Sequence, residues 1–393
     1  MKHADFKHHL QLTLPTLIVL VVAAFVRLKL GAAEPANGLE RTVEIMSRTG
    51  LSAHEEDEMT AGYYEGLLDG SEKTARGHGG LLRNLGSLKP APPDWKDFSD
   101  TEAVRKLPGF RRYDIKPGID IPFKGDRLQS NHLGMRDRDY DQTKPAGVRR
   151  LALVGSAISM GTGIPIDKTF EALLEARLNG EPVCEGAMPC EILNLSVPGY
   201  MFTQQLDLAL SATSEYDVDA VLFVVNYLAV GPMWSSHLGT LIQEGDDLKY
   251  TFLREIVQKA GVSPSDSTAR IATKLAPHRL ELFAAAIREA RVQLQAEGAQ
   301  LVLVAIPFPA QRKMINGKIT DALEAVSAEQ IPVWSCLDAF GDIAPEDLRL
   351  REWDNHPNER GHQLMFEALD KELRNNSRLR HIIAGCHEQG ATQ

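Results

Sequence analysis

The chain has 393 residues and a formal net charge of −10; 43% of its residues are hydrophobic and 24% are charged. This composition is typical of a folded globular protein rather than a disordered chain, and the length exceeds that of one average domain. With an isoelectric point near 5.7, the chain lacks the basic balance that nucleic-acid binding requires. We therefore expect a folded protein without a nucleic-acid partner, long enough for one α/β domain and accessory segments.

The N-terminal segment predicts a membrane anchor. Residues 10–26 carry no charge, and cations lie on both sides of them, at Lys7 and at Arg27 and Lys29. With the leucines that follow, this run reaches the lower limit for a helix that spans a bilayer. A cleaved signal peptide is the alternative, which the two cations after the apolar run disfavour. We expect a single-pass transmembrane anchor over residues 10–30.

Residues 31–147 follow this anchor and predict an accessory region of helical and extended segments. The unit 131–137 (NHLGMRD) closes that region and leads into the next strand.

From residue 148 to residue 376, apolar runs that end at turn residues alternate with segments of helical spacing. Strands are predicted at 151–154, 191–196, 220–225, 300–306 and 332–336. Helices are predicted at 167–178 with Asp167 as cap, at 203–212 with Thr203 as cap, and at 279–296 and 363–373. This alternation predicts a parallel sheet with helices on both faces. The insertion at 231–275 is a candidate lid, with a surface decoration that buries its aromatic residues as the alternative.

The cysteines point weakly to an oxidising compartment. Cys184 and Cys190 bracket a short loop and are candidates for a local disulfide, whereas we expect free thiols at Cys336 and Cys386. The predicted organisation is a tail at 1–9, the anchor at 10–30, the accessory region at 31–147, the α/β domain at 148–376 and a C-terminal tail at 377–393.

Two motifs point to chemistry. The first is LALVGSAISMGTGI at 151–164, where an apolar strand ends at Gly155 and a glycine-rich turn follows. Such a turn lies at the carboxyl end of a strand, where open α/β sheets form their sites. The second is DNHPNERGH at 354–362, which presents Asp354 and His356 ahead of a helix. We expect His362, at the end of this motif, to cap or pack within that helix.

These motifs resemble blocks I and V of the SGNH (GDSL-type) hydrolases, and the 131–137 unit resembles a bacterial, membrane-tethered group of that family. The second resemblance implies that the unit braces the edge of a sheet, with contact between Arg136 and an acidic sugar as the alternative. The residues that agree with block I are Gly155, Ser159, Gly161 and Gly163. The resemblance implies a three-layer αβα fold of the flavodoxin-like kind, and a catalytic pair made by Asp354 and His356. It also implies three oxyanion donors, which are the backbone N–H groups of residue 157 and Gly199 and the side-chain amide of Asn226.

The position of the nucleophile departs from the family. Ala157 stands where block I has its serine, and Ser156 stands where it has its aspartate. Alanine keeps the N–H group that stabilises an oxyanion but lacks the hydroxyl that an imidazole would activate. Loss of the nucleophilic serine costs subtilisin on the order of 10⁶ in turnover. We therefore expect little or no esterase turnover from this sequence, with Ser156 as the alternative nucleophile.

Two functions follow from the resemblance. One is a membrane-anchored SGNH-type esterase or O-acyltransferase that acts on acyl esters, with cell-surface polysaccharide as the substrate class. The other is a non-catalytic pseudo-hydrolase that binds an acylated glycan or serves as a scaffold subunit for protein partners in a membrane complex. An alanine at 157 fits both a deliberate inactivation and a natural pseudoenzyme.

By analogy with the family, the chain is expected in the bacterial inner membrane, with its C-terminal domain in the periplasm or outside the cell. We expect neither a metal nor an organic cofactor, because the sequence shows no clustered His and Cys spacing and no phosphate-binding loop.

Overall fold

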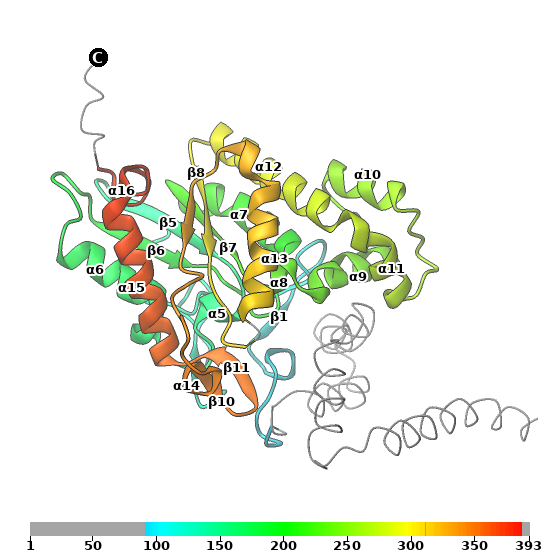
Figure 1. Ribbon diagram of the computed structural model, residues 1–393, viewed down its shortest axis with the longest axis horizontal. Coiled ribbons are helices and arrows are strands. Elements are labelled where there is room, and N and C mark those ends of the chain that lie inside the picture. Colours follow the sequence, from blue (N-terminus) through cyan, green and yellow to red (C-terminus); the bar gives the residue numbers. More distant parts are fainter. Residues whose placement is uncertain (1–90, 311, 387–393) are drawn as a thin grey trace, which may run out of the picture. The chain divides into compact units, whose positions relative to one another are not determined.

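The computed structural model describes residues 91–310 and 312–386, and Figure 1 shows how their helices and strands are arranged. The predicted anchor at 10–30 and the predicted helical part of the accessory region lie outside these residues. Among the helices that are described, none combines the length and the apolarity needed to cross a membrane.

Five parallel strands form the central sheet, in the spatial order β6-β5-β7-β8-β9. They are β5 (Arg149–Val154), β6 (Cys190–Asn194), β7 (Ala220–Val225), β8 (Gln300–Ala305) and β9 (Val333–Ser335). All of them overlap the predicted strands; β5 to β8 are made mainly of buried apolar residues, whereas β9 is short and buries Trp334 alone among its three residues. Of these five strands, β5 comes first in the chain, yet it lies between β6 and β7. The strand order therefore reverses at the β5–β7 pair. In open α/β sheets the crevice at the carboxyl ends of such strands binds the ligand.

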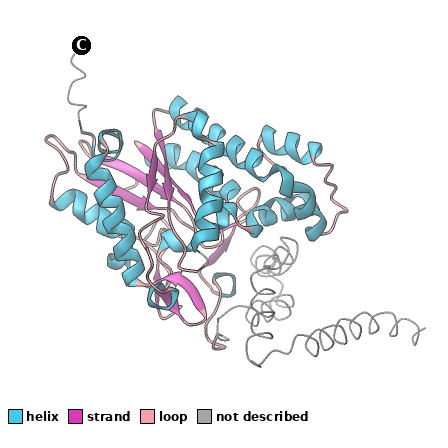
Figure 2. Ribbon diagram, in the orientation of Figure 1, coloured by secondary structure: helices cyan, strands magenta, loops and turns pink. Residues whose placement is uncertain are grey.

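Helices cover both faces of the sheet, as Figure 2 shows. One face carries α7 (Phe202–Tyr216), α12 (Arg279–Ala296) and α13 (Arg312–Ala325); the other carries α6 (Phe170–Gly180), α15 (Glu359–Asn375) and α16 (Ser377–Ala384). Successive side chains of a strand point to opposite faces. In β5, Ala152 and Val154 accordingly join the core under α7 and α12, whereas Leu151 and Leu153 join the core under α6 and α15. The predicted α/β architecture, with helices on both faces of a parallel sheet, is confirmed.

Two of the predicted helix caps are wrong. Thr169 caps α6, because its hydroxyl accepts a hydrogen bond at 3.1 Å from a backbone N–H of the first turn. Asp167 lies earlier, in the 3₁₀ turn η2 (Ile166–Lys168). Helix α7 begins after Met201, so Thr203 lies inside the helix instead of capping it.

The described part of the accessory region consists of short antiparallel pairs that stay separate from the central sheet. It contains the 3₁₀ turn η1 (Phe98–Asp100), the pair β1 (Val104–Lys106) and β2 (Tyr113–Ile115), and the pair β3 (Asp120–Phe123) and β4 (Asp126–Gln129). Strands β3 and β4 form a hairpin, and its two loop residues are Lys124 and Gly125.

The unit 131–137 braces the free edge of the sheet, as predicted. The Asp137 carboxylate accepts a hydrogen bond from the Asn194 N–H at 2.9 Å, and beside it the carboxylate of Glu175, from α6, accepts one at 2.5 Å from a second N–H of β6. Because β6 has a partner strand on one side alone, these carboxylates occupy donors that would otherwise be unpaired. The buried guanidinium of Arg136 donates to main-chain carbonyls around the glycine-rich turn, which assigns it a structural role instead of a sugar contact.

The insertion at 231–275 packs beside α7 and α12. It contains η3 (Pro232–Ser235), α9 (Ser236–Glu244), α10 (Thr251–Lys259) and α11 (Thr268–Leu275), preceded by α8 (Tyr227–Val230) and followed by η4 (Ala276–His278). Met233 and Trp234 are buried. His237 is buried between the Thr203 hydroxyl at 2.8 Å and the Phe110 carbonyl at 2.6 Å. The aromatic residues of the insertion are therefore buried, and its role as a lid stays a prediction.

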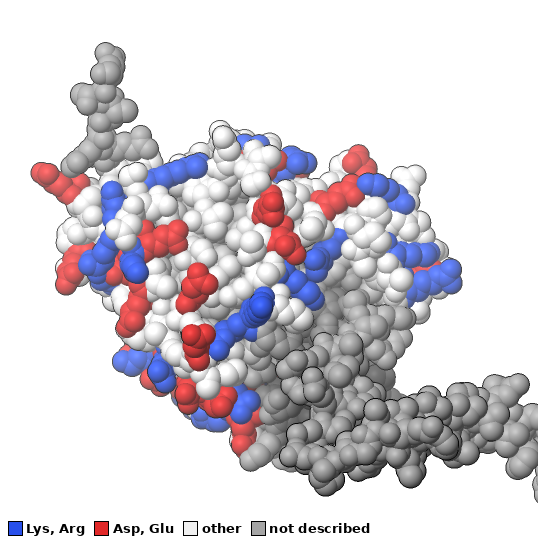
Figure 3. All heavy atoms as spheres, viewed as in Figure 1, with Lys and Arg blue, Asp and Glu red and all other residues white. Residues whose placement is uncertain are grey.

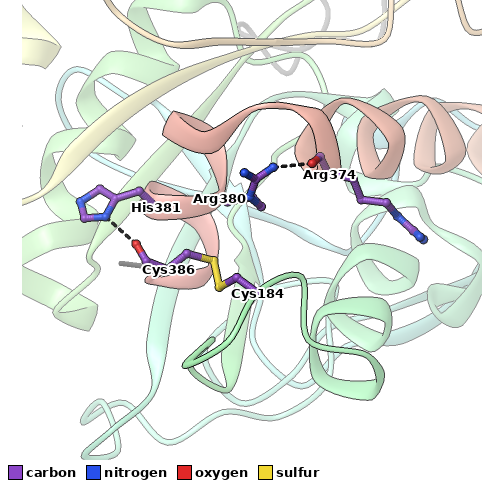
Figure 4. Close-up of a disulfide and its surroundings, with 5 residues drawn as sticks. All are labelled: Cys184, Arg374, Arg380, His381 and Cys386. Carbon is purple, nitrogen blue, oxygen red and sulfur yellow. Dashed lines mark hydrogen bonds between the residues drawn. A yellow bond between two sulfur atoms is a disulfide. The ribbon is translucent and has the colours of Figure 1, made fainter. Parts of the chain in front are cut away.

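The C-terminal end packs on the core and carries a disulfide between Cys184 and Cys386, shown in Figure 4. The predicted pairing of Cys184 with Cys190 and the predicted free thiol at Cys386 are therefore wrong. Cys190 begins β6, where its backbone N–H and carbonyl bind the Asn179 side chain and its thiol is buried. Helix α16 brings Cys386 to the loop instead, so the packed domain extends beyond its predicted end at 376. Cys336 is a buried free thiol, as predicted.

The surface that Figure 3 presents carries acidic and basic side chains interspersed with one another. Several of the described charges pair across elements, such as Lys259 with Glu281 at 2.8 Å. Among the described residues, the large hydrophobic side chains that are exposed are Val292 and Met314. This face is therefore a solvated surface of mixed charge.

Candidate active site

The turn after β5 is held by its own side chains. Gly155 is required there, because a Cβ at this position would lie 2.1 Å from the Ser159 hydroxyl oxygen. That hydroxyl accepts a hydrogen bond from the Ser156 N–H at 2.9 Å and donates one to the Ser156 carbonyl at 3.0 Å. The chain then enters the short helix α5 (Ala157–Met160). Ser159 thus stabilises the turn.

Ala157 is the residue of this turn that reaches the surface. It is partly exposed, whereas Ser156 before it is fully buried. The first N–H groups of a helix have no acceptor within the helix, and Ala157 is the first residue of α5. Residue 157 therefore has a partly exposed side chain and an N–H group with no acceptor inside α5.

Asn226 follows β7 and faces the same turn. Its side-chain Oδ1 accepts a hydrogen bond from the Leu228 N–H at 2.9 Å and so caps α8. This contact fixes the amide, and its Nδ2 donates to the Ser156 hydroxyl at 2.8 Å. An amide nitrogen carries two N–H groups, and within the described chain Nδ2 makes this one hydrogen bond. The second N–H of Nδ2 has no acceptor among the described residues, and the Asn226 side chain is buried.

Gly199 lies in the turn after β6, next to the turn after β5. The two turns are joined by a hydrogen bond from the Val197 N–H to the Gly155 carbonyl at 3.3 Å. The φ angle of Gly199 is +84°, which favours glycine. No acceptor for its N–H is found in the part of the chain that the structure describes. The three predicted oxyanion donors thus follow the adjacent strands β6, β5 and β7.

Asp354 and His356 lie on β11 (Asp354–Pro357), which pairs with β10 (Arg349–Arg351) after the short helix α14 (Pro345–Leu348). Residues two apart on a strand point to the same face, and this is why a single intervening residue brings the two side chains together. His356 Nδ1 lies 2.5 Å from Asp354 Oδ1, which also accepts the His356 backbone N–H at 3.0 Å. The carboxylate thereby orients the imidazole and leaves Nε2 for proton transfer.

The other oxygen of Asp354 is held from the accessory region. Trp95 Nε1 and Lys124 Nζ each donate to Asp354 Oδ2 at 2.9 Å. Burial raises the pKa of Asp354, but the contacts with His356 and Lys124 outweigh it and hold the pKa well below its usual value. Sequence reasoning missed Trp95 and Lys124, because nothing in their local pattern connects them to a residue so far along the chain.

The two halves of the candidate site are neighbours, since α5 and β11 lie side by side (Figure 1). One half supplies N–H donors and the methyl group of Ala157, and the other supplies the His356 imidazole with its carboxylate. N–H donors and a carboxylate-supported imidazole are the kinds of group that acyl transfer uses. This set lacks the attacking oxygen, which a serine at position 157 would provide.

The remaining histidine of the motif has a structural role. His362 is buried, accepts a hydrogen bond from the Phe170 N–H at 3.1 Å and stacks on the Phe170 ring. Burial lowers the pKa of His362 to about 3, so it stays neutral. In the described chain, no three His, Cys, Asp or Glu side chains are grouped to hold a metal ion.

Comparison with known proteins finds structures but no sequence match. No family model and no curated protein match the chain. It is similar to the psychrotrophic esterase EstA from Pseudoalteromonas sp. (16% identity over 58% of this chain and 100% of that chain, TM-score 0.35). It is also similar to a member of the lipolytic G-D-S-L family from Veillonella parvula (13% identity, 57% and 97% of the two chains, TM-score 0.34). A third is a mutant of Axe2, an acetyl-xylooligosaccharide esterase from Geobacillus (14% identity, 57% of this chain and 94% of that chain, TM-score 0.36). The G-D-S-L family is the one that the two motifs resemble.

Proposed function

We propose that the chain is a membrane-anchored SGNH-type esterase or O-acyltransferase scaffold in which Ala157 occupies the place of the nucleophile. The observation that carries this proposal is the Asp354–His356 pair, held at 2.5 Å on a strand beside α5. A positioned imidazole next to convergent N–H donors is the arrangement that acyl transfer needs.

With a serine at 157, each group has a defined task. His356 Nε2 takes the proton of the serine hydroxyl as the hydroxyl oxygen attacks the ester carbonyl carbon. The carbonyl oxygen becomes negative and is stabilised by the N–H groups of residue 157 and Gly199 and by the Asn226 amide. His356 then gives its proton to the departing alkoxide, and an acyl-serine remains. Water releases the acyl group in an esterase, and the hydroxyl of an acceptor does so in an O-acyltransferase.

Ala157 favours a second candidate, a pseudo-hydrolase that binds an ester without cleaving it. The methyl group occupies the position of the attacking oxygen, while the N–H donors and the catalytic pair are kept. Such a crevice retains the groups that bind an acyl ester. The chain with Ala157 would then act as a glycan-binding or scaffold subunit of a membrane complex.

The disulfide supports a location outside the cytoplasm. Structural disulfides persist in oxidising compartments such as the periplasm, and Cys184–Cys386 closes the α/β domain. With the anchor predicted at 10–30, we propose the bacterial inner membrane, with the C-terminal domain in the periplasm. Acylated cell-surface polysaccharide is the substrate class that such a location offers.

The test is to restore the hydroxyl. The variant Ala157→Ser should hydrolyse p-nitrophenyl acetate and react covalently with a fluorophosphonate probe, and the chain with Ala157 should do neither. The double variant Ala157→Ser/His356→Ala is the matched control and should lose both activities. If the folded Ala157→Ser protein shows no hydrolysis and no labelling, the esterase proposal fails.

A further inference from the structure

We propose that Lys124 is a positioning residue that fixes the Asp354 carboxylate so that it can orient His356. This inference rests on the proposed function. The Lys124 ammonium lies 2.9 Å from Asp354 Oδ2, and the side chains are 7% and 5% exposed. A second carboxylate, that of Asp97, lies 3.5 Å from the same nitrogen. A cation buried to this extent requires such partners, and one of them is the acid of the catalytic pair.

The backbone at Lys124 is unfavourable for lysine. Lys124 has a φ of +49° and Gly125 a φ of +87°, and these two residues form the whole loop between β3 and β4. A two-residue hairpin loop with both φ angles positive favours Asn-Gly, because residues other than glycine, asparagine and aspartate are strained in the left-handed region. Strain of this kind persists where the surrounding structure uses it. The ammonium contact with Asp354 is a use that asparagine could not supply.

The two oxygens of Asp354 have separate tasks. Oδ1 binds the imidazole and the backbone N–H of His356. Oδ2 binds Lys124 and the Trp95 indole at 2.9 Å each. Rotation of the carboxylate would break contacts on both sides at once, so Lys124 and Trp95 keep Oδ1 directed at the imidazole. Both residues belong to the accessory region, which therefore completes a site whose other groups come from the α/β domain.

The experiment uses Lys124→Asn, because asparagine suits the loop and removes the cation. In the Ala157→Ser background, we expect kcat for p-nitrophenyl acetate to fall about tenfold or more, the scale of one lost charge-assisted hydrogen bond, with KM little changed. Thermal stability serves as the folding control. Asp120→Asn, which removes an exposed ion pair with Arg127 in the same hairpin, should leave kcat unchanged. An unchanged kcat in folded Lys124→Asn would overturn the proposal.

A second readout does not depend on catalysis. In the full chain with Ala157, the proton NMR resonance of the His356 Nδ1–H reports its hydrogen bond to Asp354. We expect Lys124→Asn to shift this resonance or to broaden it by exchange with water, and Asp120→Asn to leave it in place. If Ala157→Ser is inactive while the resonance responds, the proposed function fails and the role of Lys124 stands. An unchanged resonance contradicts that role even if the restored enzyme is active.

Discussion

The Asn226 amide donates to the Ser156 hydroxyl across 2.8 Å, and both side chains are buried. This hydroxyl has no exposed surface and already accepts a hydrogen bond. We therefore expect the chain with Ala157 to resist a fluorophosphonate probe, whether Ser156 is present or changed to alanine. Intact-mass measurement checks this, with Ala157→Ser as the labelled reference. A probe adduct on Ser156 would show that Ser156 is the nucleophile after all.

Asp354→Asn in the Ala157→Ser background should lower kcat strongly. The corresponding Asp→Asn change in trypsin costs about 10⁴, because the imidazole is held in the wrong tautomer. We expect a loss approaching that size, with little change in KM, from steady-state hydrolysis of p-nitrophenyl acetate. Asp167→Asn, at an exposed position in η2, is the matched control. A loss below tenfold would mean that Asp354 does not support His356.

Stability should fall as the pH rises from 5 to 8. Burial raises the pKa of Asp137 to about 7 and raises that of Glu171 well above its usual value. In the unfolded chain such carboxyls titrate near pH 4, so over this window the folded state binds protons that the unfolded state does not. The free energy of unfolding therefore decreases with rising pH and levels off once the folded carboxyls have ionised.

Asp137→Asn tests this directly, since asparagine resembles the protonated carboxyl. We expect the variant to lose less stability between pH 5 and pH 8 than the parent chain in urea unfolding monitored by circular dichroism. Asp217→Asn, at an exposed position, should keep the parent slope. Asp354, whose pKa is lowered, acts in the opposite sense, and its contribution is lost as the pH falls below about 4. Identical slopes for the parent and Asp137→Asn would contradict the prediction.

Removing the disulfide should destabilise the domain. Cys184 and Cys386 are 202 residues apart, so the bond restricts a long loop in the unfolded chain. We expect Cys386→Ala to lower the free energy of unfolding by about 2–5 kcal/mol, and reduction of the parent chain to have the same effect. Peptide mapping under non-reducing conditions should recover Cys184 linked to Cys386. A Cys184–Cys190 peptide would restore the pairing expected from the sequence.

The elements that the sequence predicts well are those specified by local pattern. The bounds of β7 and α12 match their predictions because a buried apolar run and a long amphipathic period are properties of adjacent residues. The cap of α6 was missed because Asp167 and Thr169 both suit an N-terminus. The choice between them depends on the intervening 3₁₀ turn.

The parts that could not be predicted depend on tertiary contact. The pairing of Cys184 with Cys386 requires α16 to fold back on the loop, and the contact of Lys124 with Asp354 joins residues 230 positions apart. The motifs did identify residues of the turn after β5 and of β11, which the fold makes neighbours. The distances between atoms of the site could not be predicted from the sequence, because they depend on contacts between residues far apart in the chain.

The contact between the β3–β4 loop and Asp354 has a practical consequence for dividing this protein into parts. A fragment that starts at residue 148 would retain every strand of the central sheet and both members of the Asp354–His356 pair. It would lack the lysine and the indole that hold the acid in place. A fragment for assay should therefore begin before Trp95. A fragment that begins at the first strand of the central sheet would be defective in proton transfer even if its backbone fold were native.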